Sequence, residues 1–163
     1  MIAKIELLYG WLRKIGDSLQ SPFLLLIRLY WGWQFFQSGW AHLHTIPKFI
    51  EYMASLGIPA PTLNAYFVAV LETVGGILLA LGLGSRLISL LLAGDMFVAF
   101  VTADREALLS MFSDTDKFYA AAPYTFLFAC LIILFFGPGK LSLDHLIATK
   151  RRKAAPVPAI ATK

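Results

Sequence analysis

Four long apolar stretches, each close to twenty residues, constrain this chain more than any other feature of its sequence. They cover residues 21–41, 63–83, 86–103 and 119–136. A helix needs about 20 mostly apolar residues to cross the hydrocarbon core of a membrane. The chain is 58% hydrophobic and only 15% charged, whereas a soluble domain carries about 25% charged residues. We therefore predict an all-α integral membrane protein, built as a bundle of four transmembrane helices.

We place the predicted bundle at residues 21–146. The segments on either side of it have different sequence patterns. In residues 1–20 apolar side chains recur at helical spacing, with charged side chains on the other side. This pattern predicts an amphipathic helix that either lies in the membrane interface or docks on the bundle. Ser142 is suited to cap a short interfacial helix over residues 143–149. Residues 147–163 are expected to form a basic, disordered tail.

The connections between the apolar stretches differ in length. Residues 82–86 form a short glycine-containing link, which predicts an antiparallel hairpin between the second and third spans. The longer connection, residues 42–62, is still half apolar. We expect a short helix here that lies on the bundle through Ile46, Phe49, Ile50, Met53 and Leu56.

Lysine and arginine predict the orientation of the bundle. If the N-terminus, the 82–86 turn and the C-terminal tail share one side, that side carries ten basic residues: Lys4, Arg13, Lys14, Arg86, Lys140, Lys150, Arg151, Arg152, Lys153 and Lys163. The opposite side carries three: Lys48, Arg105 and Lys117. Cytoplasmic loops hold the excess of basic residues, so both termini are predicted to face the cytoplasm.

Three ionisable residues lie inside the predicted spans: Arg28, Glu72 and Asp95. Each costs about 2.5–3.5 kcal/mol at the centre of a membrane helix, even on mild insertion scales. Counted from the cytoplasmic ends, their depths are compatible, so we predict an Arg28–Glu72 pair with Asp95 as its third member. The cluster has two interpretations: a site that handles protons or grips a ligand, or an ion pair that only fixes helix order.

Four candidate ligand contacts belong to the first span: Trp31, Gln34 and Phe35, with His42 at its outer end. The aromatic residues of this span could stack on a quinone head group, or they could form the interfacial belt of a membrane helix. The histidines lack the spacing of a known zinc or copper set, so no metal is predicted. The basic residues at the chain ends indicate a lipid surface as partner and no nucleic acid.

Common catalytic motifs are missing from the sequence. It contains no Gly-x-Ser-x-Gly, no P-loop and no dinucleotide-binding glycine pattern. Its single cysteine, Cys130, rules out a Cys-x-x-Cys redox motif. Any chemistry would therefore need a partner chain or a bound redox cofactor, of which quinone is the candidate.

Three motifs resemble the DoxX family of small four-span membrane proteins. The first is Arg28 followed by Gly32 and Gly39; the second is Glu72, Gly75, Gly76, Leu79 and Gly82, leading to Arg86; the third is the run Gly-Pro-Gly-Lys-Leu-Ser-Leu-Asp at 137–144. The sequence departs from the family where His42 stands, because the family more often has a lysine there.

The resemblance implies a protein of the bacterial or archaeal cytoplasmic membrane. Family members are tied to quinone-linked oxidation of sulfur compounds beside a second chain, to thiol and oxidative-stress systems, or to assembly of other membrane proteins. The leading hypothesis is a redox-associated subunit that binds quinone or couples a partner oxidoreductase to the quinone pool. A structural or assembly role is the alternative, and a small transporter is a third.

Overall fold

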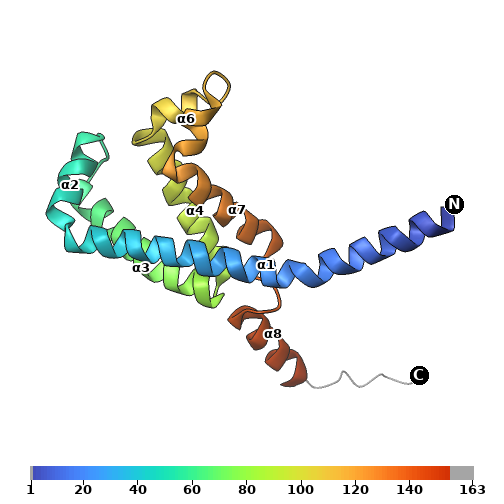
Figure 1. The fold of residues 1–163 in the computed structure, drawn as a ribbon. Coiled ribbons are helices and arrows are strands. Elements are labelled where there is room, and N and C mark those ends of the chain that lie inside the picture. Colours follow the sequence, from blue (N-terminus) through green and yellow to red (C-terminus); the bar gives the residue numbers. More distant parts are fainter. Residues whose placement is uncertain (1, 155–163) are drawn as a thin grey trace, which may run out of the picture.

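The computed structural model describes residues 2–154, and all the regular structure in this range is helical (Figure 1). The helices are α1 (Ile2–His44), α2 (Ile46–Ser55), α3 (Pro61–Leu81), α4 (Ser85–Thr102), α5 (Arg105–Leu109), α6 (Thr115–Ala120), α7 (Ala122–Phe136) and α8 (Leu143–Ala154). The all-α prediction is confirmed.

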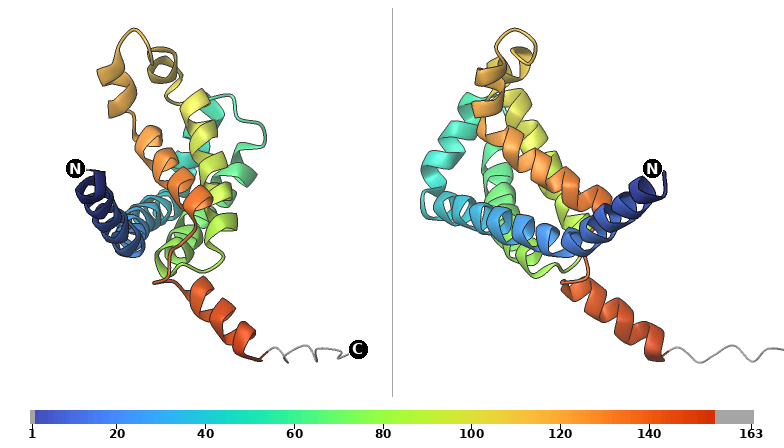
Figure 2. Two further views of the ribbon diagram at one scale, coloured as in Figure 1. Left: turned by 90° about the vertical axis from the view of Figure 1, so that its right-hand side faces the viewer. Right: turned by 45° about the vertical axis from the view of Figure 1, so that its right-hand side comes forward.

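Two helix pairs form the body of the protein. α1 packs along α3, α4 packs along α7, and the α3–α4 contact joins the pairs. Figures 1 and 2 show that the pairs meet near the turn between α3 and α4 and diverge toward the end that carries α2, α5 and α6. α8 lies at the opposite end. We refer to these as the α2 end and the α8 end.

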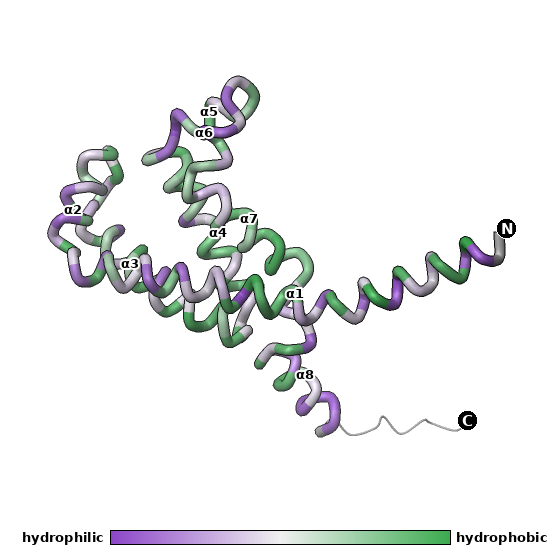
Figure 3. The backbone as a smooth tube through the Cα atoms, viewed as in Figure 1, coloured by the Kyte–Doolittle hydropathy of each residue, from purple (hydrophilic) through white to green (hydrophobic). Residues whose placement is uncertain are grey.

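Within residues 2–154, two helices are long and apolar enough to cross a membrane: α3 and α4. α7 is also apolar but shorter, with 15 residues. Large apolar side chains face outward on α3 and α4, among them Phe67, Val74, Leu87 and Leu90, and Figure 3 shows how apolar these helices are along their length. An apolar exterior of this kind suits lipid as the surrounding medium.

Glycines on α1 and α3 allow the closest helix contact in the structure. A Cβ at Gly32 would lie 2.7 Å from the Gly76 carbonyl oxygen, and one at Gly76 would lie 2.6 Å from the Phe36 amide nitrogen. Small residues permit such close approach between membrane helices. Gly32 and Gly39 of the first motif and Gly76 of the second therefore serve this contact.

The structure corrects two predicted boundaries. Residues 2–20 are helical but continue directly into the first span as one helix, which projects from the bundle through exposed residues 4–20 (Figure 1). α7 begins at Ala122 instead of 119, because Ala121 is extended and Pro123 occupies the first turn, where its missing N–H is tolerated. The predicted spans at 63–83 and 86–103 agree with α3 and α4 to within two residues.

The C-terminal prediction is wrong in part. A helix follows Ser142 as expected, and the Ser142 hydroxyl accepts from the His145 amide at 3.2 Å. The helix does not stop near residue 149, however, and the basic run Lys150–Lys153 lies within α8 instead of a disordered tail. Basic side chains in the last turn interact favourably with the negative end of the helix dipole. The rest of the expected tail, 155–163, lies outside the described residues.

Candidate functional site

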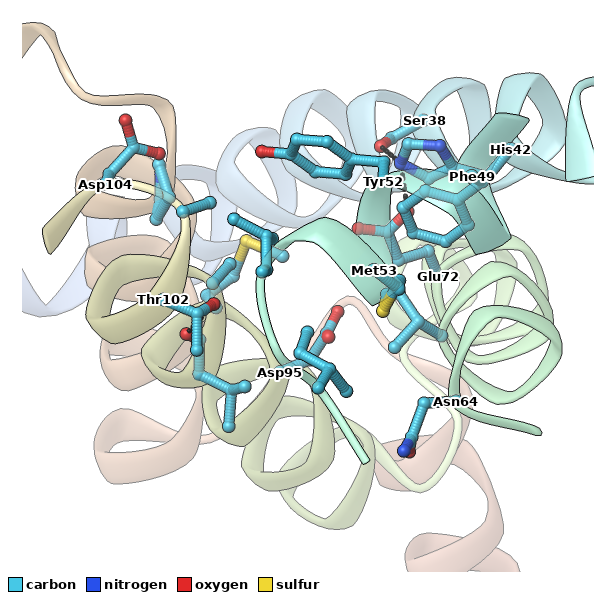
Figure 4. A pocket seen from close by; sticks show the side chains of 18 of the residues that line it. Ser38, His42, Phe49, Tyr52, Met53, Asn64, Glu72, Asp95, Thr102 and Asp104 are labelled. Atoms are coloured by element: carbon cyan, nitrogen blue, oxygen red, sulfur yellow. Dashed lines mark hydrogen bonds and ion pairs between the residues drawn. The ribbon is translucent and has the colours of Figure 1, made fainter. Parts of the chain in front are cut away.

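A cavity of about 280 Å³ lies at the α2 end, between the two diverging helix pairs. Its walls are mostly apolar and come from α1, α2, α3, α4 and the start of α7. Polar side chains enter it from three helices: Ser38 and His42, Glu72, and Asp95 (Figure 4). We call this cavity the Glu72 pocket.

Glu72 is the most buried acid of the pocket, with 4% of its surface exposed. Its Oε2 atom has no hydrogen-bond partner and lies 3.7 Å from Nε2 of His42. The same imidazole nitrogen lies 3.4 Å from the Ser38 hydroxyl. The His42 ring also stacks on Phe49 of α2, with ring centres 3.8 Å apart and planes within 8°. This stacking holds the imidazole against the carboxylate.

Asp95 approaches the pocket from α4, and its Oδ2 atom is buried without a hydrogen-bond partner. Figure 4 shows the carboxyl groups of Glu72 and Asp95 turned into the same cavity. Buried polar atoms are nearly always hydrogen-bonded in native proteins. The two unpartnered carboxylate oxygens are therefore available to a hydrogen-bonding group that enters the cavity.

Arg28 does not join these acids, so the predicted Arg28–Glu72 pair is wrong. Arg28 is fully buried at the α8 end, where its Nη2 donates to the Leu141 carbonyl and its Nη1 lies against Gly82. Along α1, Arg28 and His42 are about 21 Å apart at 1.5 Å per residue. The chain after α7 brings the Leu141 carbonyl and the acid Asp144 close to Arg28. The carboxylate of Glu72 on α3 is too distant to pair with it.

Asp144 joins this second group of polar residues, which we call the Arg28 cluster. Its carboxylate accepts from the amides of Gly84 at 2.8 Å and Ser85 at 2.9 Å, and its own amide donates to the Gly82 carbonyl at 2.9 Å. The first amides of a helix lack partners within the helix, and an acid is favourable there. Asp144 thus caps α4 and attaches α8 to the α3–α4 turn.

The turn itself requires glycine, because Gly82 and Gly84 have φ of 71° and 60°. L side chains rarely adopt this left-handed conformation. The predicted tight turn at 82–86 is confirmed. Arg28, Gly82 and Asp144 come from the three separate family motifs, so the motifs meet in one place and stabilise the α8 end.

Acidification is expected to weaken the Arg28 cluster. Burial by itself raises the pKa of Asp144, but the hydrogen bonds from Ser85 and Gly84 and the charge of Arg28 outweigh it and hold the pKa below its usual value. A lowered pKa in the folded state gives stability that is present above the ordinary aspartate pKa of about 3.9 and is lost as pH falls through the folded-state value. Asp144→Asn should lower the melting temperature at pH 7, and this difference should disappear under acid. A difference that persists unchanged at the lowest pH would contradict the assignment.

The other candidate contacts from the sequence lie behind the pocket. Phe35 is fully buried and packs on Phe126, with ring centres 4.7 Å apart, and Trp31 packs on the same ring at 5.0 Å. Gln34 lies within hydrogen-bond distance of the Tyr30 hydroxyl, at 3.4 Å. Of the four predicted contacts only His42 lines the cavity, and the other three support its Phe126 wall or face elsewhere.

Several lining residues were not predicted as site residues: Phe49, Tyr52, Met53, Asn64, Asp104 and Phe126. The apolar spacing in residues 46–56 predicted a helix on the bundle, and that helix supplies the first three. The sequence did not show that α2 folds over Glu72 and His42. Within residues 2–154, no group of three or more His, Cys, Asp or Glu side chains is arranged to hold a metal ion.

A helical protein with two apolar helices long enough to cross a membrane, and with an acid buried between its helices, has the features of a membrane-associated protein. Residues 23–105 match the family model of DoxX, and this match covers half of the chain. The chain belongs to the DoxX family.

One curated relative is the protein named "Putative oxidoreductase CatD" from Bacillus subtilis (strain 168). It is 31% identical over 83 residues, which are 51% of this chain and 60% of that protein. The similarity therefore leaves a substantial part of both chains unmatched. No solved structure matches this chain.

Proposed function

We propose that this protein is a four-span subunit of the bacterial cytoplasmic membrane, with both termini in the cytoplasm, that binds quinone for a partner oxidoreductase. The spans are the bundle part of α1, then α3, α4 and α7. The excess of basic residues at the termini and the α3–α4 turn supports this orientation. The name of the Bacillus relative supports a redox role.

The observation that carries the proposal is the combination of apolar walls and unpartnered acids in the Glu72 pocket. Small-molecule sites are mostly apolar, with a few polar groups that orient the ligand, and typically enclose about 300–1,000 Å³. At about 280 Å³ the pocket suits a single ring. Phe49 and Phe126 offer ring faces, and His42 and Ser38 offer hydrogen-bond donors to a quinone oxygen.

A bound quinone would supply two-electron chemistry, with two protons taken up on reduction. The protein's own part is to bind and orient the ring, to exclude bulk water with the apolar walls, and to hold protons. Glu72 can carry a proton on Oε2. This atom has no hydrogen-bond partner within the described part of the protein, so its proton is free to point at a ligand. Asp95 provides a second carboxyl group for the second proton. The partner subunit supplies the electrons in this proposal.

The protein purified in mild detergent is expected to carry quinone detectable by extraction and mass spectrometry. Glu72→Leu should lower the bound amount by about tenfold, equivalent to about 1.4 kcal/mol of binding, because leucine has no hydrogen-bonding group for the ligand oxygen. Glu51→Leu, on the exposed face of α2, is the matched control and should retain quinone. Wild-type protein that carries no quinone and brings down other membrane proteins would instead support an assembly role.

The assembly alternative has one observation in its favour. The first part of α1 projects from the bundle with exposed apolar side chains, among them Leu8, Trp11 and Leu12. Such a surface would suit a helix of a partner chain as well as a lipid interface. A redox subunit needs a partner too, so the quinone content distinguishes the two roles better than co-purification alone.

A further inference from the structure

We propose that the Glu72 pocket exchanges protons only with the side of the membrane opposite α8, and that His42 is the residue through which they pass. The proton-transfer role rests on the proposed quinone site. The side from which the pocket is accessible is a property of the fold alone and can be measured without quinone.

The position of the pocket supports access from the α2 end. Its rim carries the polar residues Asn64, Thr102 and Asp104, and Tyr52 of the rim is 48% exposed. Figure 4 shows Asn64 and Asp104 on different sides of the cavity, away from the Glu72 carboxylate. Water can reach such a polar rim when it lies at the membrane surface.

The opposite route passes through a packed and mostly apolar core, which also holds the buried hydroxyls of Ser85 and Ser89. Between the acids and the Arg28 cluster lies one core that includes Leu79, Leu92, Cys130 and Ile133, none more than 1% exposed. Leu79 follows Glu72 by two turns on α3, and Leu92 precedes Asp95 by one turn on α4. Protein interiors of this kind are close-packed and leave no room for a chain of water.

His42 is placed to connect Glu72 with the rim. Its side chain is 33% exposed, while that of Glu72 is 5% exposed, and their nearest atoms are 3.7 Å apart. Catalytic hydrogen bonds are often longer than usual before a ligand binds and shorten afterwards. The titratable groups that share the cavity with His42 are Glu72 from α3, Asp95 from α4, Asp104 from the end of α4 and Tyr52 from α2; the α7 residues of the wall are apolar.

The proton step balances without a redox partner. A hydronium ion at the rim gives a proton to Nδ1 of the neutral imidazole and becomes water, while the proton on Nε2 passes to the ionised Glu72 carboxylate at Oε2. The imidazole is again neutral, in its other tautomer, and a tautomer exchange restores the starting state. Glu72 then holds the proton for the ligand oxygen.

The accessible side can be tested by thiol labelling in a Cys130→Ser background. Glu72→Cys should react with a small, membrane-impermeant thiol reagent added outside right-side-out spheroplasts, and not with reagent added to the cytoplasmic face of inverted vesicles. Phe112→Cys, at a loop position 94% exposed, and Lys150→Cys on α8 report the outer and inner faces. Ser89→Cys, fully buried, should stay unlabelled from outside. Labelling of Glu72→Cys only from the cytoplasmic face, or from neither face, would overturn the proposal.

The role of His42 can be tested by infrared spectroscopy of hydrogen–deuterium exchange. At a pH low enough to protonate it, the Glu72 carboxyl band is assigned by its loss in Glu72→Gln. His42→Gln should slow exchange of this band by about tenfold or more, since a positioned acid–base group contributes about 100-fold or more to proton transfer. His44→Gln, on the same helix end but bonded to the Trp40 carbonyl at 2.9 Å, should not change it.

The two proposals fail in different ways. If exchange is unchanged in a folded His42→Gln variant that keeps its quinone, the proton role is wrong and the quinone site stands. If exchange slows as expected in protein that never carries quinone, the access route stands and the proposed function is wrong.

Discussion

Gly39→Ala is expected to unfold or severely destabilise the protein. A Cβ at residue 39 would lie 2.7 Å from the Ala69 carbonyl oxygen and closer still to the Thr73 amide. These are backbone atoms of α3, so the two helices must separate along their whole contact. Overpacking of a core costs about 1–3 kcal/mol, and occasionally more; we expect a value at or above the upper end. Cys130 is fully buried in the fold, so a thiol-specific dye reacts with it only as the protein unfolds. The loss of stability is measured with this dye as a lower melting temperature.

Gly94→Ala is the matched control for this prediction. Gly94 also lies within a helix, but a Cβ there meets no atom within 4 Å. Alanine favours a helix over glycine by about 1 kcal/mol, so this variant should melt at the same temperature or higher. Equal melting of the Gly39 and Gly94 variants would contradict the close α1–α3 contact.

Arg28→Gln is expected to give the second largest loss of stability. The change removes the charge opposite Asp144 and the donor to the Leu141 carbonyl, both at the α8 end. Hydrogen bonds to charged groups contribute about 1.5–3 kcal/mol; with the lost attraction between Arg28 and Asp144 added, we expect about 3 kcal/mol. The thiol-dye melt measures this loss, and limited trypsin digestion at Lys150–Lys153 reports whether α8 has detached.

Arg105→Gln serves as the control for charge alone, because Arg105 is exposed and lies on the other side of the bundle. It should leave both the melting temperature and the trypsin pattern unchanged. Quinone content gives a further readout: an Arg28→Gln protein that remains folded should keep its quinone, since Arg28 does not line the Glu72 pocket. Selective loss of quinone from folded Arg28→Gln would show that the two ends are functionally linked.

The two groups of buried polar residues therefore have separate expected roles. The Arg28 cluster has a hydrogen bond from α1 to the segment before α8 and hydrogen bonds from the α3–α4 turn to Asp144 of α8. This is the arrangement of a structural contact, although Nε and Nη1 of Arg28 have no hydrogen-bond partner among the described residues. The Glu72 pocket has acids with unpartnered oxygens beside an open cavity. Arg28, Glu72 and Asp95 were predicted as one cluster, with a functional and a structural interpretation. The structure separates Arg28 from the two acids, and we propose that the functional interpretation applies to the acids.

Much of the fold could be predicted because its signals are local. The lengths of the apolar stretches predicted α3 and α4, the glycines predicted the turn between them, and the apolar spacing predicted α2. The continuous α1 was missed because residues 1–20 and 21–41 differ in composition but carry no helix-terminating sequence that outweighs helix formation. Pro22 lies within the helix and did not separate them.

The sequence by itself determined that the chain is helical and apolar enough for a membrane. It also determined that three ionisable residues lie in the apolar stretches. These properties depend on composition and on periodicity within one helix. Only the tertiary structure decided which groups those residues meet: Leu141, 113 residues from Arg28, and His42 beside Glu72. The reason is physical, because a buried charge is stabilised by whichever partner the packing brings to its own depth and face. That partner depends on how distant segments cross, and not on the pattern within any one of them.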